Sequence, residues 1–371
     1  MKEKASAAIK AAFLLLAAAF CLGMPDMVRT AAAEGISRCL YIIIPSLYAM
    51  LIVSALMIRS GLVFRAPGIL TLPGRILFGM ESSIFPVFTF SMFAGYPVGA
   101  GMLAAQTASG RLSRERAAVL AGLCFGAGPA FIFSCAAAQV FGDISAGAVI
   151  LISSVGSNLI LALLLSPFLR RLPKAADTGD KPELVLDAGL VSDCISGAGR
   201  SMAKLCFMVV AFSVLSGIFR TVGLVSAAAG IVSRLSGHSP ELSQALVCSF
   251  LDITAVSALP QSGEVLLPAV CGLISFGGIC VFFQLRAAAA GQFSLVPAFI
   301  IRIAAGVLSY GICRVIAPAD IAGRVTAVSA VISPHAVRTH QADSAVPSVM
   351  LIIMTVVVMY QGSRSGGRSA E

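Results

Sequence analysis

"FAGYPVGAG", residues 93–101, interrupts an apolar run that extends over residues 83–105. That run is long enough to cross a ~30 Å hydrocarbon core as one helix. Three glycines and one proline nevertheless stand near its middle, and a helix that only crosses lipid has no use for them. Because glycine permits turns and proline removes a backbone donor, the pattern predicts a re-entrant hairpin with its turn near Tyr96–Pro97.

The composition places the whole chain in a membrane. Of its 371 residues, 58% are hydrophobic and 12% are charged, and the mean hydropathy is +0.96. A single soluble core cannot bury so much apolar side chain, so the sequence predicts an all-α polytopic membrane protein. The formal net charge is +9. Since the arginines lie in short segments between apolar runs, they indicate control of topology and no binding of nucleic acid.

Hydropathy divides the chain into two membrane halves. We expect an N-terminal helix and loop (1–34), a first repeat (35–169), a cytoplasmic polar linker (170–193), a second repeat (194–317), and a polar segment with a C-terminal helix (318–371). An uncleaved first helix is favoured over a signal peptide because many spans follow. The predicted spans are 7–23, 39–58, 118–140, 145–169, 201–220, 264–285, 296–316 and 345–361, with a short or interfacial helix at 223–235.

Basic segments set the predicted orientation. Residues 59–75, 111–116 and 170–174 are rich in arginine, and such segments stay in the cytoplasm. If 83–105 crossed the membrane completely, 111–116 would lie outside. If 83–105 enters and returns, all three segments lie inside, so the hairpin also satisfies the charge distribution.

The second half resembles the first. Residues 35–62 align without gaps on 197–224, with identical residues at Gly35/Gly197, Arg38/Arg200 and Gly61/Gly223. By the same comparison 83–105 corresponds to 242–260, and 122–133 corresponds to 272–283. With the orientation above, 39–58 and 201–220 run in opposite directions. The sequence therefore predicts inverted repeats, an architecture whose site lies near the midplane at broken helices.

The interrupted segment 93–101 has two possible uses. Irregular backbone at membrane depth is tolerated where it packs against protein or lines a watery cavity. Gly95 and Gly99, four residues apart, would suit close helix packing. Pro97 between them favours the cavity instead. "GAGP" at residues 126–129 is predicted to be a second break of the same kind.

Asp252, in "CSFLDIT", is the most informative ionisable residue. A carboxylate near the middle of the bilayer costs about 2.5–3.5 kcal/mol on insertion scales, so it is seldom kept without a use. Proton coupling, cation coordination and pairing with an arginine are the candidate roles. A structural ion pair with Arg302 or Lys204 is the alternative. We expect Asp252 to face the interior, close to residues 93–101.

Signals for catalysis, cofactors and metals are absent from the sequence. The ten cysteines contain no C-x-x-C pair, and the three histidines lie far from them. No Gly-x-Ser-x-Gly, His-Glu-x-x-His or Walker motif occurs, so neither an enzyme nor a cofactor is predicted. Asn158, Thr254 and Gln284 can each hydrogen-bond between helices.

Four stretches, "FAGYPVGAG", "SGRLSRERAAVLAGLCFGAGPAFIF", "SFLDIT" and "GLISFGGICVFFQ", resemble the sporulation integral membrane proteins of the YlbJ type. These belong to the group with the Gate domain of nucleoside and ferrous-iron transporters. The resemblance covers about residues 35–316, and it implies a multi-pass protein of the cell or forespore membrane that serves spore development by moving dipicolinate. It implies a substrate-binding or gating role for Gly95, Tyr96, Pro97, Gly99, Ala100, Gly128, Pro129, Asp252, Thr254 and Gln284.

Three functions are compatible with these features. The broken segments, the inverted halves and the resemblance favour a permease for a small organic anion, whose carboxylate suits a half-helix N-terminus. A membrane scaffold without transport, needed for spore cortex or coat assembly, is the second. A nucleoside or cation permease is the third, if Asp252 couples a cation. Membrane lipid is the expected surrounding, and a homo-oligomer is compatible with the sequence.

Overall fold

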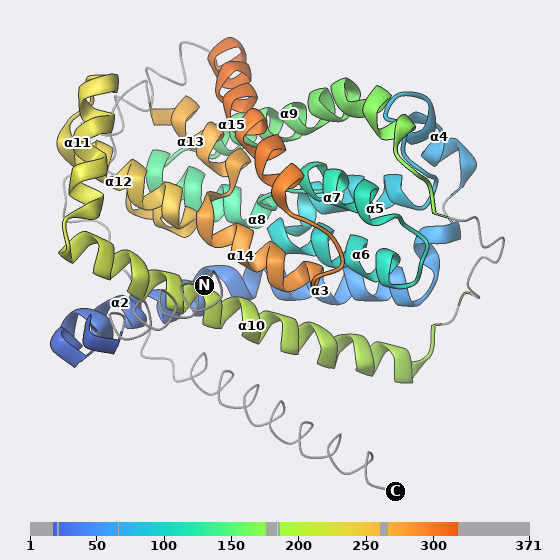
Figure 1. Ribbon diagram of the computed structural model, residues 1–371, viewed down its shortest axis with the longest axis horizontal. Coiled ribbons are helices and arrows are strands. Elements are labelled where there is room, and N and C mark those ends of the chain that lie inside the picture. Colours follow the sequence, from blue (N-terminus) through green and yellow to red (C-terminus); the bar gives the residue numbers. More distant parts are fainter. Residues whose placement is uncertain are drawn as a thin grey trace, which may run out of the picture.

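The computed structural model describes residues 18–317 apart from residues 21, 66, 176–183, 185 and 260–265. The described part of the chain is built from helices without strands (Figure 1). Five of its helices are long and apolar enough to cross a membrane. The chain is therefore an all-α polytopic membrane protein, as predicted. Most of the expected span 7–23, and all of 318–371, lie outside the described residues.

The first half begins with one long helix that has three sections. These are α2 (Pro25–Arg38), the π-helical η1 (Cys39–Ile43) and α3 (Ile44–Arg59). Pro45 has no backbone N–H, and the wider turn of η1 just before it lets the helix continue. The expected boundary at 34/35 falls inside this helix. The half continues with η2 (Leu62–Arg65), α4 (Gly68–Ile76), α5 (Ile84–Ala94), α6 (Tyr96–Ala108), α7 (Arg114–Leu123), α8 (Pro129–Phe131), η3 (Ile132–Phe141) and α9 (Ile144–Arg171).

The second half begins earlier than expected. Its first helix starts at Ala188, before the expected boundary at 193/194. The cause is a cap, since the Asp187 carboxylate accepts a hydrogen bond from the Leu190 N–H at 2.6 Å. The elements are α10 (Ala188–Thr221), α11 (Leu224–Ser236), α12 (Pro240–Leu251), η4 (Ile253–Ala258), α13 (Leu266–Phe276), α14 (Gly278–Ala289) and α15 (Val296–Ile316).

Two of the expected spans are interrupted. The helix expected over 118–140 stops at Leu123 and resumes at Pro129. The span expected over 264–285 changes course at Gly277, which has a positive φ of 95°. The expected spans 145–169 and 296–316 correspond to the continuous helices α9 and α15.

The two halves repeat one order of elements. Each has a long helix, a short helix, an interrupted hairpin, a broken helix and a final long helix. Gly61 and Gly223, aligned in the sequence, follow the first long helices with φ values of 80° and 85°. Gly128 and Gly278, aligned in the same way, begin the second parts of the broken helices with φ values of 77° and 78°. Such agreement is expected of a duplicated chain, because only glycine adopts these angles readily.

The two long first helices run in opposite directions, as the sequence predicted. Gly35 faces Ser213, whereas Gly217 faces Met27, so rising numbers on one helix meet falling numbers on the other. Small residues let the two backbones approach closely. In Figure 1 this pair, α2–α3 with α10, runs along one edge of the molecule, and α9 runs along the opposite edge.

The three basic segments of the first half meet at one end of the molecule, which we call the basic end. The Arg116 side chain is fully buried there and donates to the carbonyls of Leu169 at 2.6 Å and Gly79 at 2.9 Å. Its Nε lies 3.2 Å from a carboxylate oxygen of Glu81. Burial raises the pKa of the Glu81 carboxyl, and the Arg116 charge opposes that shift. The hydroxyl of Ser113 donates to the carbonyl of Pro173 at 2.6 Å. The basic segments are therefore on one side, as the topology requires.

Candidate functional site

The chain reverses at Gly95, where φ is 100° and ψ is 152°. The amide of Gln106 at the end of α6 donates to the carbonyl of Ser83 before α5, at 3.4 Å. A continuous helix would hold these two residues about 35 Å apart. The predicted hairpin is thus confirmed, with its turn one residue earlier than expected.

The second hairpin is interrupted at Asp252. Its Oδ1 accepts hydrogen bonds from the backbone N–H of Thr254 at 3.0 Å and from the Thr254 hydroxyl at 2.8 Å. These bonds end α12 and begin the tighter helix η4. Asp252 thus occupies the position in the second hairpin that Gly95 occupies in the first.

Each hairpin break touches the glycine that restarts the broken helix of its own half. A Cβ on Gly128 would lie 3.3 Å from the carbonyl oxygen of Phe93, and a Cβ on Gly278 would lie 3.3 Å from the carbonyl oxygen of Phe250. Phe93 is two residues before Gly95, and Phe250 is two residues before Asp252. The same backbone contact is therefore built twice.

The glycines of the first break serve close packing. A Cβ on Gly99 would lie 2.1 Å from the carbonyl oxygen of Cys124, and one on Gly95 would lie 2.1 Å from a methyl group of Leu47. Ala100 is buried beside them. Tyr96 is also buried, and its hydroxyl donates to the Ile274 carbonyl of α13 at 2.9 Å. Of the two uses considered for 93–101, packing therefore describes these four residues.

A buried guanidinium lies between the two broken helices. Arg302 on α15 has 0% of its surface exposed. It donates to the carbonyl of Ser275 at 3.2 Å and to Oδ1 of Asn158 at 2.6 Å, and its charge lies 4.6 Å from the centre of the Phe125 ring. The Asn158 amide donates to the Phe125 carbonyl at 2.7 Å. Arg302, which the sequence offered as an alternative partner of Asp252, therefore contacts the ends of two helices instead.

The two helix breaks explain why Arg302 is buried. Where α7 and α13 end, their last carbonyls lack helical partners and carry partial negative charge. Phe125 and Ser275 are equivalent residues in the two repeats, so Asn158 and Arg302 satisfy matching carbonyls. No carboxylate of the described chain pairs with Arg302. We call Asn158 and Arg302 the central clamp.

Asp252 is interior, with 2% of its surface exposed. Its partner is Arg38 of α2, at 3.3 Å, and not Arg302 or Lys204. Asp252 was expected to lie close to residues 93–101. In the structure Gly277 and Gly278 lie between Tyr96 and Ile253, so the two segments are neighbours through these glycines. The ion pair therefore joins the first long helix to the second hairpin.

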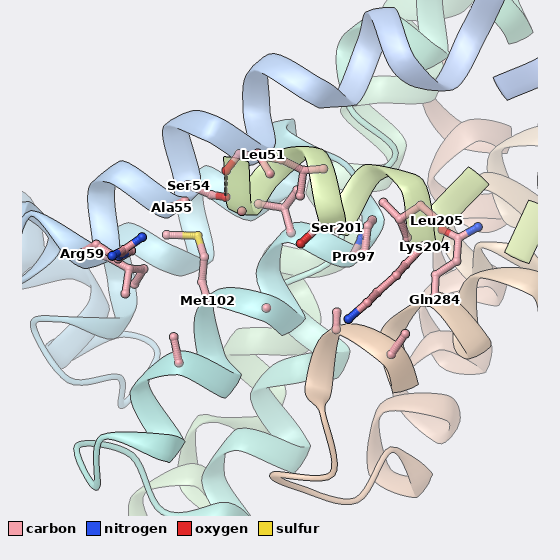
Figure 2. A pocket seen from close by; sticks show the side chains of 18 residues that line it. Leu51, Ser54, Ala55, Arg59, Pro97, Met102, Ser201, Lys204, Leu205 and Gln284 are labelled. Atoms are coloured by element: carbon pink, nitrogen blue, oxygen red, sulfur yellow. Dashed lines mark hydrogen bonds between the residues drawn. The ribbon is translucent and has the colours of Figure 1, made fainter. Parts of the chain in front are cut away.

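A cavity of about 330 Å³ lies between α3, α6, α10 and α14, so both repeats line it (Figure 2). Pro97 and Gln284 of the predicted site lie on its wall, together with Val98 and Gly101 from the interrupted segment. The other predicted residues, Gly95, Tyr96, Gly99, Ala100, Gly128, Pro129, Asp252 and Thr254, do not line it.

Three polar side chains reach this cavity, two of them without partners and the third with one weak partner. Lys204 and Ser201 of α10 form no hydrogen bond or ion pair with the described residues. Gln284 is 7% exposed; its amide N–H donates weakly to the Cys280 sulfur at 3.5 Å, and its oxygen accepts no hydrogen bond within the described chain. Figure 2 shows Lys204 extending from α10 past Pro97. The cavity thus has one unneutralised positive charge and unused polar atoms.

Sequence reasoning missed Ser201 and treated Lys204 only as a partner for Asp252. A signal was present: Gly197, Ser201 and Lys204 recur at helical spacing on one face of an otherwise apolar span. Arg59, at the rim of the cavity, is paired with Asp193 at 3.1 Å.

The described residues contain no group of three or more His, Cys, Asp or Glu side chains that could hold a metal ion. No family model, no curated protein and no solved structure matches the chain.

Proposed function

We propose that the protein is a permease that carries a small organic anion across its membrane through the cavity between α3, α6, α10 and α14. The observation that carries this proposal is the unpaired Lys204 in a cavity of about 330 Å³ that both repeats line. Cavities of roughly 300–1,000 Å³ are typical of small-ligand sites.

The charge of the cavity favours an anion over a cation. Lys204 is exposed where it lines the cavity, and no described carboxylate neutralises its charge, so an anion that enters the cavity meets a free positive charge. A substrate carboxylate would neutralise this charge, with the Ser201 hydroxyl and the Gln284 amide as further partners. Asp252 would be the natural partner of a cation, but Arg38 already binds it. The nucleoside or cation alternative therefore has less support.

The two sides of the molecule differ as an alternating-access cycle requires. The cavity extends toward the basic end, where Arg59 stands at its rim. Arg38 lies about 31 Å from Arg59 along the same helix, and there the Arg38–Asp252 pair joins the two repeats. This arrangement suits a state that is open toward the basic end and closed on the other side.

Dipicolinate is the first substrate to test, because the resemblance to sporulation membrane proteins points to it and because it is a small planar dicarboxylate. The experiment is uptake of labelled dipicolinate by vesicles that contain the purified protein. We expect saturable uptake, a fall of at least roughly tenfold in Lys204→Gln (about one lost charge-assisted contact) and retention in Lys204→Arg. Arg65→Gln, which removes a charge outside the cavity, should transport normally.

Folded protein that carries neither dipicolinate nor other small carboxylates would overturn the permease and leave the scaffold hypothesis. Equal uptake by Lys204→Gln and the native chain would move the site away from this cavity.

A further inference from the structure

A second cavity, of about 550 Å³, lies at the basic end between the start of α7 and the segment that joins α14 to α15. Ala287 of α14 lines both cavities. Arg114, from the first repeat, and Arg286, from the second, both contribute to its wall. The remaining lining residues are Ala287, Ala289, Ala290, Gly291, Gln292, Phe293, Ser294 and Leu295.

The wall of this cavity is cationic and rich in hydrogen-bond donors. Arg114 and Arg286 form no ion pair with the described residues, and no acidic side chain is among the lining residues. The Ser294 oxygen accepts from the Val296 N–H at 3.3 Å, so its hydroxyl proton remains free to donate. Gln292 adds an amide. Two guanidinium groups in one cavity repel each other unless an anion lies between them, and a phosphate suits such a pair.

An apolar surface leads away from this cavity along α15. Val296, Ile300, Ile303 and Val307 are 65%, 62%, 48% and 71% exposed. Their spacing of four, three and four residues places them on one helix face. That face begins beside Leu295, which lines the cavity.

We propose that this cavity binds the phosphate of an anionic phospholipid, with the acyl chains lying along the exposed face of α15. A soluble phosphate would use the arginines but would leave the adjoining apolar face without a role. A phospholipid uses both, because its charged headgroup and its acyl chains are joined at the boundary between water and hydrocarbon. Basic cavities at the cytoplasmic ends of membrane helices suit such headgroups. This site does not depend on transport by the protein.

The test uses the purified full chain in detergent, with phosphatidylglycerol and phosphatidylcholine of identical acyl chains, and native mass spectrometry to count retained lipid. We expect phosphatidylglycerol to be retained preferentially. Arg114→Gln/Arg286→Gln should weaken this retention at least roughly tenfold. Arg65→Gln/Arg171→Gln removes the same charge from the basic end but outside the cavity, and it should retain lipid as the native chain does.

Three results would overturn the site: equal retention of both lipids by the native chain, an equal loss in both double variants, or no loss in Arg114→Gln/Arg286→Gln. Glycerol phosphate is the soluble probe, and binding as tight as that of the lipid would identify a soluble anion as the ligand instead. If the double variant does not fold, the single variants Arg114→Gln and Arg286→Gln replace it in the lipid measurement. Each should lose part of the preference for phosphatidylglycerol.

Discussion

The two hairpin breaks share a backbone and differ in side chains. In both halves a glycine with positive φ, Gly128 or Gly278, packs on a carbonyl of the hairpin at the same distance. In the first half the break is Gly95, and the cavity adjoins the helix that follows it. In the second half the break is Asp252, and Arg38 binds it.

The comparison shows that the repeats share backbone contacts and differ in the side chains beside them. At Gly128 and Gly278 a positive φ and a close backbone contact with the hairpin disfavour a side chain, and glycine stands at both positions. Side chains beside the breaks can diverge. Beside the first break, residues of both halves line a cavity that contains the unpaired Lys204, and at the second break Asp252 pairs with Arg38 of the first half. Under the proposed permease function, a symmetric fold can thus hold a state that is open on one side and closed on the other.

The largest expected effect comes from the central clamp, which joins equivalent carbonyls of the two repeats. Asn158→Leu removes a donor from the Phe125 carbonyl and an acceptor from Arg302, and all of these groups are buried. Each unpaired buried group costs about 1–3 kcal/mol, and a charged one costs more. We expect a loss of about 3–5 kcal/mol in unfolding free energy, measured by SDS titration in mixed micelles.

Asn158→Asp is the matched control for the clamp. It keeps an acceptor for Arg302 and loses only the donor to Phe125, so its loss should be smaller. If Asn158→Leu and Asn158→Asp were equally and only slightly destabilised, the clamp would not hold the two repeats together.

The second expected effect tests the equivalence of the two glycines. Gly128→Ala and Gly278→Ala each place a methyl group 3.3 Å from a hairpin carbonyl at a positive φ, and on Gly278 the methyl group would also lie 3.0 Å from the backbone nitrogen of Ile253. Backbone strain of this kind costs about 1–3 kcal/mol. We expect both variants to lose similar stability within that range. Gly230→Ala, where a Cβ would meet no atom within 4 Å, is the control and should be neutral or stabilised. Unequal losses would show that the two breaks differ in backbone as well as in side chains.

The features that followed from the sequence are those that depend on local backbone rules. Gly95 and Pro97 predicted the hairpin, and constant spacing predicted the opposed long helices. The features that sequence reasoning missed depend on distant partners. Arg302 was considered only as a partner of Asp252, and its contacts with two helix ends depend on the fold. Asp252 had several possible partners, and in the structure it pairs with Arg38. Unpaired Lys204 becomes informative only when its neighbours are known.

The third expected effect concerns the closed side. Asp252→Asn keeps the hydrogen bonds to Thr254 but loses the charge that faces Arg38. Arg38 is 17% exposed, so solvent lessens the cost of losing its partner. In a double-mutant cycle with Arg38→Gln we expect a coupling of about 1–2 kcal/mol.

The same substitution should loosen the contact between η3 and η4. Cys135 on η3 is 0% exposed in the native chain. On a background without the other cysteines, Asp252→Asn should increase its reaction with a water-soluble maleimide. Unchanged labelling together with zero coupling would show that the pair does not close this side.

The smallest expected effect tests the repeats at their periphery. Gly61 and Gly223 follow the two first long helices with φ values of 80° and 85°, and both are needed because this left-handed region strains any residue with a Cβ. A Cβ on Gly223 would meet no atom within 4 Å, so the backbone angle is the sole source of cost there. We therefore expect Gly223→Ala to lose about 1 kcal/mol in the same SDS titration. Gly61→Ala should lose at least as much, because Gly61 is buried whereas Gly223 is only half-buried. Gly223→Asn should recover part of the loss, since asparagine tolerates this region better than alanine.

A Gly61→Ala variant as stable as the native chain, beside a destabilised Gly223→Ala, would mean that the two turns had diverged and that the equivalence of the repeats ends at the hairpins.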